Sequence, residues 1–161
     1  MIQTAKGLSL TQPWASLIAD GKKTIETRRW KTSYRGPILI CSTKAKIDNY
    51  PSGVTICLCD LVDIRPMIKY DEEKACCRIY SNAYSWIMEN IQTVMHIPMR
   101  GSLFLFDVYF DQSCYEWKRK DISFRENDKQ LLVTKPPISN TDMHPNSKDV
   151  KIGNLFSTAI L

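Results

Sequence analysis

The sequence predicts an α+β domain that is built mainly from β-strands and carries one short helix near its N-terminus. Apolar residues run without a break over residues 37–41 and dominate residues 54–64, as they do in strands covered by a core. Residues 14–18 show the i, i+3, i+4 apolar spacing of an amphipathic helix. With 161 residues, of which 43% are hydrophobic and 24% charged, the chain has the size and composition of one globular domain.

The N-terminal segment predicts a strand, a helix and a helix stop in close succession. Leucines alternate with a serine over residues 8–10, which is the period of a half-buried strand. The helix is expected to begin at Pro13, where the missing N–H of proline costs nothing, with Thr11 or Gln12 as its cap. Gly21 is expected to end it in the left-handed conformation. The apolar face of this helix consists of Trp14, Leu17 and Ile18.

The remaining elements follow from apolar patterns and from turn residues. The first are a charge-rich strand at 22–30, a loop at 31–36, a strand at 37–41 and a turn at 46–53. A long strand is expected at 54–64, followed by a surface excursion with a helical turn at 65–80. The last are a short helix or tight connection at 81–90, a strand at 91–97 and a strand at 103–110. Beyond residue 110 the sequence becomes strongly charged, with a short edge strand expected at 131–133 and an apolar tail at 152–161 that is expected to dock.

An ordered set of residues around the helix resembles the signature of a known family. The motif is Gly21-x-Lys23-x-x-Glu26-x-Arg28, preceded by Leu8-Ser9-Leu10-x-Gln12-Pro13-Trp14-Ala15. Further landmarks are Trp30, Tyr34-Arg35-Gly36, Trp86, Glu89-Asn90, Ile97-Pro98, Arg100-Gly101 and Leu103-Phe104-Leu105-Phe106. Over roughly residues 5–110 the chain therefore resembles the ASCH domains, which are small members of the PUA-like β-barrel superfamily. The resemblance implies a PUA-like β-barrel with a short N-terminal signature helix over residues 1–110, and it leaves 111–161 as a C-terminal extension, packed on the barrel or partly flexible.

The positive charge of the chain is concentrated on this signature. Residues 1–45 contain eight Lys or Arg and two acidic residues, whereas the remainder contains fourteen basic and fifteen acidic residues. The net charge of +5 therefore arises entirely from the N-terminal part, and this focused placement suggests an anionic ligand. The alternative is a solvated face that only keeps the domain in solution, and the charge alone favours this alternative.

The spacing of the signature places its charges on one face of the strand. If Ile25 points into the core, alternation sends Glu26, Arg28 and Trp30 to the opposite face, and Lys23 can reach the same space from the entry of the strand. Cations attract phosphate, indoles stack on bases and a carboxylate accepts from a base amino group. The alternative is a salt-bridge network that fixes the helix to the strand, with the tryptophans in the core; for Trp14 the core position is favoured.

The resemblance implies that the signature lines a cleft for RNA or a modified nucleotide. Lys23, Glu26 and Arg28 are then expected to contact the ligand and to be open to solvent. The second contacts expected from the resemblance are Trp30, Tyr34, Arg35 and Trp86, with Lys44 as a weaker candidate.

Two other function classes stay open. One branch of the ASCH family removes the acetyl group of N4-acetylcytidine with a Lys-x-x-Thr pattern, whereas this chain has Lys23-x-x-Glu26. Here Glu26 could act only as a general base for water, so Lys23 and Glu26 are the catalytic candidates if the chain is an amidohydrolase or a ribonuclease. A protein-interaction adaptor, with a purely structural signature and a binding surface in 111–161, is the third hypothesis.

The sequence predicts no metal site, no cofactor and no membrane segment. Its six cysteines and two histidines lack the spacing of zinc ligands, and Cys57 and Cys59 are expected to be small buried residues on one strand face. Apolar runs are too short to span a membrane, and the N-terminus lacks the pattern of a secretory signal, so the expected location is the cytoplasm.

Overall fold

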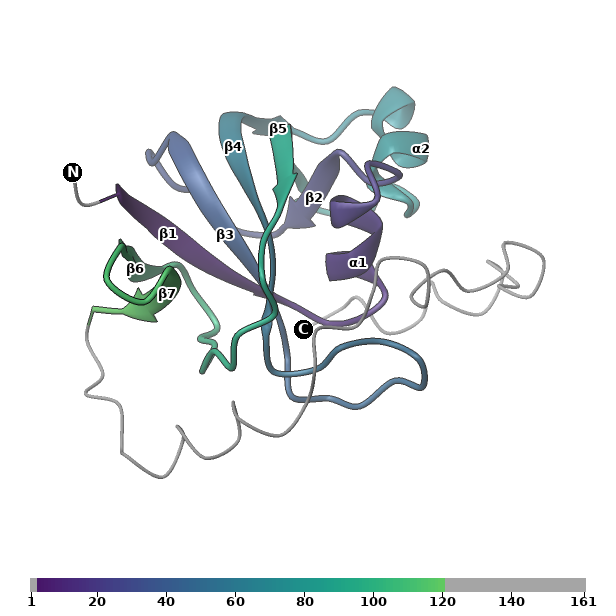
Figure 1. The fold of residues 1–161 in the computed structure, drawn as a ribbon. Coiled ribbons are helices and arrows are strands. Elements are labelled where there is room, and N and C mark those ends of the chain that lie inside the picture. Colours follow the sequence, from purple (N-terminus) through teal and green to yellow (C-terminus); the bar gives the residue numbers. More distant parts are fainter. Residues whose placement is uncertain (1–2, 121–161) are drawn as a thin grey trace.

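A computed structural model describes residues 3–120, and these residues form one seven-stranded sheet with short helices beside it (Figure 1). The strands are β1 (Gln3–Leu10), β2 (Ile25–Arg28), β3 (Gly36–Ser42), β4 (Thr55–Pro66), β5 (Tyr84–Thr93), β6 (Phe106–Asp111) and β7 (Glu116–Arg119). The helices are α1 (Trp14–Ala19), the 3-10 turn η1 (Lys69–Asp71) and α2 (Glu72–Ala75). The structure is therefore mostly sheet with few helices, as the sequence predicts.

The strand order in the sheet is β2-β5-β4-β3-β1-β6-β7. β1 and β3 are parallel, and the other neighbouring strands are antiparallel. The two edges are β2 and β7, so the sheet is open and no ladder within residues 3–120 joins these edges into a closed barrel. In this part of the chain no helix is long and apolar enough to cross a membrane.

The apolar run at 37–41 is covered on both faces of β3, as its lack of alternation predicts. Ile38 and Ile40 lie in a core cluster with residues of β1, β4, β5 and α1. Leu39 and Cys41 point the other way and pack with residues of β1, β6 and β7. Successive side chains of a strand point to opposite faces, so one five-residue run supplies two cores.

Helix α1 begins one residue later than expected, because Pro13 occupies the N-cap position. The cap is nevertheless supplied by Gln12, whose Oε1 accepts from the backbone N–H of Ser16 at 3.1 Å. Gln12 is buried, and its Nε2 donates to the carbonyl of Pro51 at 2.9 Å, which ties the helix start to the turn before β4. Gly21 follows the helix with a φ of +70°, as predicted for a glycine stop.

Several expected boundaries are wrong. The segment at 81–90, expected as a helix or connection, lies largely in β5, which ends at Thr93 instead of extending to residue 97. The charge-rich strand is shorter than 22–30, and β6 begins at Phe106, three residues after the expected start at 103. Pairing partners set these limits, since β5 is held between β2 and β4. The expected features at 131–133 and 152–161 lie outside the described residues, and the division of the chain at residue 110 stays a prediction, although β7 pairs with β6 beyond it.

Candidate functional site

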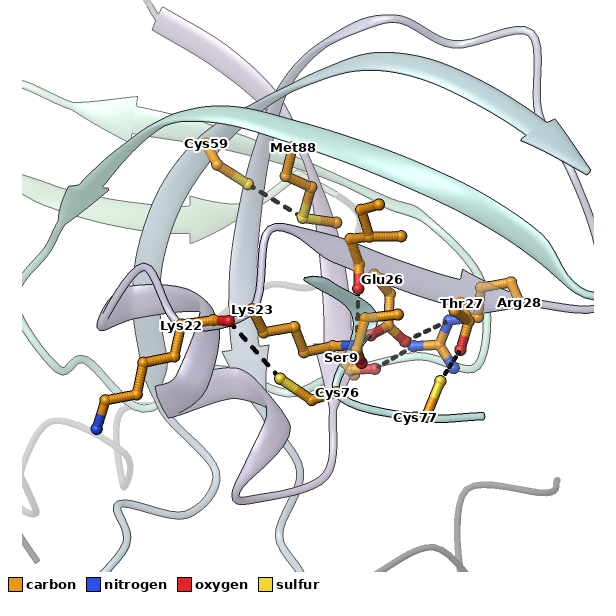
Figure 2. Close-up of polar contacts among 12 residues, drawn as sticks. Ser9, Lys22, Lys23, Glu26, Thr27, Arg28, Cys59, Cys76, Cys77 and Met88 are labelled. Atoms are coloured by element: carbon orange, nitrogen blue, oxygen red, sulfur yellow. Dashed lines mark hydrogen bonds and ion pairs between the residues drawn. The ribbon is translucent and has the colours of Figure 1, made fainter. Parts of the chain in front are cut away.

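Lys23 is buried at the turn between α1 and β2, with only 3% of its side chain exposed. Its backbone N–H donates to the carbonyl of Leu17 at 3.0 Å, which holds the turn against the helix. Its ammonium group donates to the carbonyls of Ile25 and Ala75 at 2.7 and 2.6 Å (Figure 2). Ala75 is the last residue of α2, so a segment 52 residues further along the chain covers the lysine.

Glu26 lies between the two cations of the signature. Its Oε2 is 3.2 Å from the Nζ of Lys23, and its Oε1 is 3.4 Å from the Nε of Arg28. The alternation expected for this strand is confirmed, because all three charged side chains meet on one face (Figure 2). The expectation that all three are open to solvent is wrong: Glu26 is 8% and Arg28 21% exposed. The ammonium of Lys23 donates to two carbonyls and is ion-paired with Glu26, so its charge is partnered within the protein.

Trp14 is half-buried instead of lying in the core. Helix α1 buries Ala15 and Ile18 against the sheet, and Trp14 lies to the side of that face. The ammonium of Lys23 lies over its ring, 5.6 Å from the centroid, in a cation–π contact. The indole therefore helps to shield the Lys23–Glu26 pair from water.

Trp30 and Trp86 form a pair in which only Trp30 reaches the surface. Trp86 is fully buried, and its Nε1 donates to the carbonyl of Trp30 at 3.3 Å. Their rings meet edge to face with centroids 4.7 Å apart. Trp86 has no exposed ring face for a ligand, so it supports Trp30, which in turn contacts the exposed Phe104 at 5.4 Å.

Tyr34 and Arg35 are engaged elsewhere. The hydroxyl of Tyr34 donates to the carbonyl of Pro37 at 2.7 Å, and burial raises the pKa of this phenol. Arg35 is exposed and donates to the carbonyls of Thr32 and Tyr34 within its own loop. Neither side chain has a contact with Lys23, Glu26 or Arg28 among the interactions of residues 3–120.

A pocket of about 390 Å³ lies next to Arg28, where the ends of β1 and β3 meet the loop before β6. The guanidinium group of Arg28 donates to the carbonyl of Ser9 at 3.1 Å, and Ser9 is part of the pocket wall. The wall consists of Ser9, Ser42, Thr43, Lys44, Met99, Arg100, Gly101, Ser102 and Leu103. Its charged members, Lys44 and Arg100, are exposed cations, so the rim of the pocket is positively charged.

Two buried side-chain polar atoms of residues 3–120 have no hydrogen-bond partner, and one of them belongs to a residue of the pocket wall. One is the Oγ1 of Thr43 in the wall, and the other is the Nε of Arg28, which has only its long contact to Glu26. Buried polar atoms are almost always paired, so an unpaired one calls for a partner that the protein does not supply. The unpaired hydroxyl of Thr43 in the wall therefore indicates a place for a polar ligand.

The model of the ASCH domain matches residues 8–98, which is more than half of the chain and includes the whole signature. The chain belongs to the ASCH domain family. The pocket wall therefore combines matched residues of the ASCH domain, at 9 and 42–44, with a loop at 99–103 that lies just beyond the match.

Curated relatives of this ASCH domain chain include the human and mouse proteins named activating signal cointegrator 1. The human protein is 28% identical over 120 residues, which covers 59% of this chain and 21% of that protein. The mouse protein is 27% identical over 120 residues with the same coverage. The chain thus spans about a fifth of the length of these relatives.

Solved structures similar to this chain include the crystal structure of ASCH from Zymomonas mobilis, with a TM-score of 0.49 and 18% identity, over 80% of this chain and 93% of that chain. A variant of the same protein gives a TM-score of 0.46 and 16% identity, over 80% of this chain and 96% of that chain.

Sequence reasoning missed Ser9, Thr43 and Ser102 as members of a site in this ASCH domain. Their only signal was position, since Ser9 lies in the motif that leads into α1 and Thr43 follows the end of an apolar strand. Cys57 and Cys59 are buried on β4, as predicted, and the Sγ of Cys59 lies 3.6 Å from the Sδ of Met88. Within residues 3–120 no three metal-binding side chains are grouped together.

Proposed function

We propose that this ASCH domain binds RNA or a nucleotide, including modified forms, in the pocket beside Arg28. The observation that carries the proposal is the pocket itself, which has the exposed cations Lys44 and Arg100 on its rim and the unpaired buried hydroxyl of Thr43 in its wall. A nucleotide offers both groups that such a site requires: phosphate oxygens for cations, and base or ribose atoms for a hydroxyl.

The phosphate contacts are assigned to the rim of the pocket. Lys44 and Arg100 are exposed, and they approach the pocket from the end of β3 and from the loop before β6. Arg100 can bind a phosphate through two parallel N–H groups, whereas Lys44 acts as a point charge. The excess positive charge of residues 1–45 adds a longer-range attraction for the same ligand.

In this proposal Lys23 and Glu26 act through Arg28 and do not touch the ligand. Lys23 fixes the carboxylate of Glu26, and Glu26 faces the Nε of Arg28. Arg28 is the most exposed of the three and reaches the pocket wall at Ser9. The signature is then a preorganised support for one arginine, and a rigid support lowers the entropic cost of binding.

The experiment is a titration of fluorescently labelled single-stranded RNA with the full chain, followed by anisotropy. Lys44→Ala and Arg100→Ala should each weaken binding about tenfold or less and reduce the slope of log K against log salt by about 0.7. Lys69→Ala is the matched control. Lys69 is 76% exposed on η1, so this substitution removes the same charge from an element away from the pocket. Equal binding by all three variants, or no binding by the unchanged chain, would reject the proposal and leave the adaptor hypothesis.

The same samples test whether the site performs chemistry. An amidohydrolase would release acetate from N4-acetylcytidine and lose this activity in Glu26→Gln, and a ribonuclease would shorten the labelled RNA. An activating lysine needs access to the reacting group, but the Lys23 ammonium is buried, donates to two carbonyls and is ion-paired with Glu26. We therefore expect both RNA and N4-acetylcytidine to remain intact. Turnover of either one would show that the site is catalytic, and the proposal of a binding domain would be replaced by that of an enzyme.

A further inference from the structure

Phe104 is an exposed aromatic residue next to the pocket. Its side chain is 61% exposed, and the preceding residue, Leu103, is 87% exposed and lines the pocket. Both precede β6, in a segment where the sequence pattern predicts a strand that would bury part of this apolar run. Exposed apolar residues that adjoin a cationic pocket are a common mark of a binding surface.

The ring of Phe104 is supported from behind by two tryptophans. Trp30 meets Phe104 edge to face at 5.4 Å and 66°, and Trp86 meets Trp30 at 4.7 Å and 83°. Trp86 is fully buried and also holds the carbonyl of Trp30. The chain of rings runs from the core to the surface, so the outermost ring is held in place before any ligand arrives.

The segment at 28–30 connects this ring to the pocket. Arg28 contacts the pocket wall at Ser9, and two residues later Trp30 contacts Phe104. Trp30 lies in the bend that follows the end of β2 at Arg28. Two further exposed cations, Arg29 and Lys31, flank Trp30 in the sequence. These two cations lie over the rings of Tyr80 and Tyr84, so the cations assigned to the ligand beside Phe104 are those of the pocket rim.

We propose that Phe104, supported by Trp30, is a stacking platform for an unpaired base, so that the ligand is a single strand with one nucleotide in the pocket and a neighbouring base on Phe104. This inference rests on the proposed function and specifies its ligand. Stacking needs a free base face, which a duplex does not offer within its stack. The exposed cations of the pocket rim, Lys44 and Arg100, suit a phosphate next to the stacked base.

The test compares two ligands of equal length and charge, both bound to the full chain: a labelled oligoadenylate and an abasic oligonucleotide that keeps every phosphate. Phe104→Ala should weaken binding of the oligoadenylate by roughly 5-fold to 100-fold, the effect of losing one stacked base, and leave binding of the abasic ligand unchanged. Phe104→Trp should keep the affinity for oligoadenylate. Tyr70→Ala is the control. Tyr70 is 90% exposed on η1, so this substitution removes an exposed aromatic ring from another element.

Each outcome separates stacking from the proposed function. If binding depends on Lys44 and Arg100 but is unchanged in Phe104→Ala, the stacking platform alone is overturned. The same holds if Phe104→Ala weakens the binding of both ligands equally. Equal affinity for the oligoadenylate and for its duplex with a complementary strand would also overturn it. No binding of either ligand to the unchanged chain would overturn the stacking platform and the proposed function together.

Discussion

Arg28 on β2 donates a hydrogen bond of 3.1 Å from its guanidinium group to the backbone carbonyl of Ser9 on β1. These strands are not neighbours, because β5, β4 and β3 separate them in the sheet. The contact therefore joins the free edge of the sheet to its middle, and it does so at the wall of the pocket. Arg28 thus connects the signature on β2 to the strand β1 at the candidate site.

Arg28→Ala should lower the free energy of unfolding by about 1.5–3 kcal/mol, because it removes a charge-assisted hydrogen bond from a partly buried position. Urea denaturation followed by circular dichroism measures this change. Arg29→Ala is the matched control: Arg29 is exposed, lies over the ring of Tyr80 and should cost less than about 1 kcal/mol. Equal losses in both variants would show that the bond to Ser9 contributes nothing.

Lys23→Met should destabilise the chain by about 3–5 kcal/mol, since it leaves the carboxylate of Glu26 buried without its nearest cation. Combining it with Glu26→Gln should recover part of this loss, because no unpaired charge then remains. Equilibrium unfolding in urea of the single and double variants measures the coupling. A Lys23→Met variant as stable as the unchanged chain would mean that the ammonium is retained only for a ligand.

Asp71 should make the stability depend on pH in the acid range. Two hydrogen bonds from Arg65, at 2.7 Å each, lower the pKa of this carboxyl well below its usual range, and donors from Ile68 and Ser85 act in the same direction, whereas burial opposes them. A lowered pKa in the folded state stabilises it above the ordinary pKa of about 3.9, and this contribution is lost as the pH falls below that value.

The variant Asp71→Asn isolates that contribution. It should cost about 2 kcal/mol at pH 7, less than a fully buried pair because Arg65 is 38% exposed. The difference between the two proteins should shrink from about pH 5 to pH 2, as measured by urea unfolding at each pH. Asp48→Asn, at an exposed carboxylate in the turn before β4, is the control. A difference that stays constant over this range would contradict the role assigned to Asp71.

Gly101→Ala should disturb the pocket. A Cβ atom at this position would clash with the Oγ of Ser9. This oxygen accepts a hydrogen bond from the N–H of Ser102 at 3.2 Å. The loop must move away from β1, and overpacking of this kind costs about 1–3 kcal/mol. RNA affinity should fall with stability, and Ser9→Gly in the same chain should restore the stability in part. Thermal unfolding and anisotropy on the same samples measure both, and an unchanged Gly101→Ala variant would show that the loop is not held by this contact.

The cysteines should differ in reactivity according to their burial. Burial raises the pKa of the Cys41 thiol to about 12 and that of Cys59 to about 12, and it raises the pKa of Cys57 as well. Cys114 is exposed. Because the thiolate is the reactive form, iodoacetamide at pH 8 should label Cys114 in the native chain and spare the three buried thiols until denaturant is added. Peptide mass mapping identifies the labelled sites, and early labelling of Cys57 would contradict the burial of β4.

The sequence by itself determined the local conformations. Alternation fixed which side of β2 bears Glu26 and Arg28, and the unbroken apolar run at 37–41 predicted a strand covered on both faces. The glycine after the first helix was also predicted, and Gln12 was one of the two predicted caps, because each feature depends on residues within one turn. The matched family could be recognised from the same motifs, since their order along the chain is preserved.

The tertiary structure decided what these residues face. Lys23 is buried because the carbonyl of Ala75 arrives from 52 residues away, and no local pattern carries that information. Residues 84–93 form a strand because β2 and β4 supply partners on both sides. The pocket joins residues 9, 42–44 and 99–103, which are brought together only when the sheet forms. Short-range periodicity specifies the conformation of a segment, whereas burial, pairing and cavities depend on contacts between segments that are far apart in the sequence.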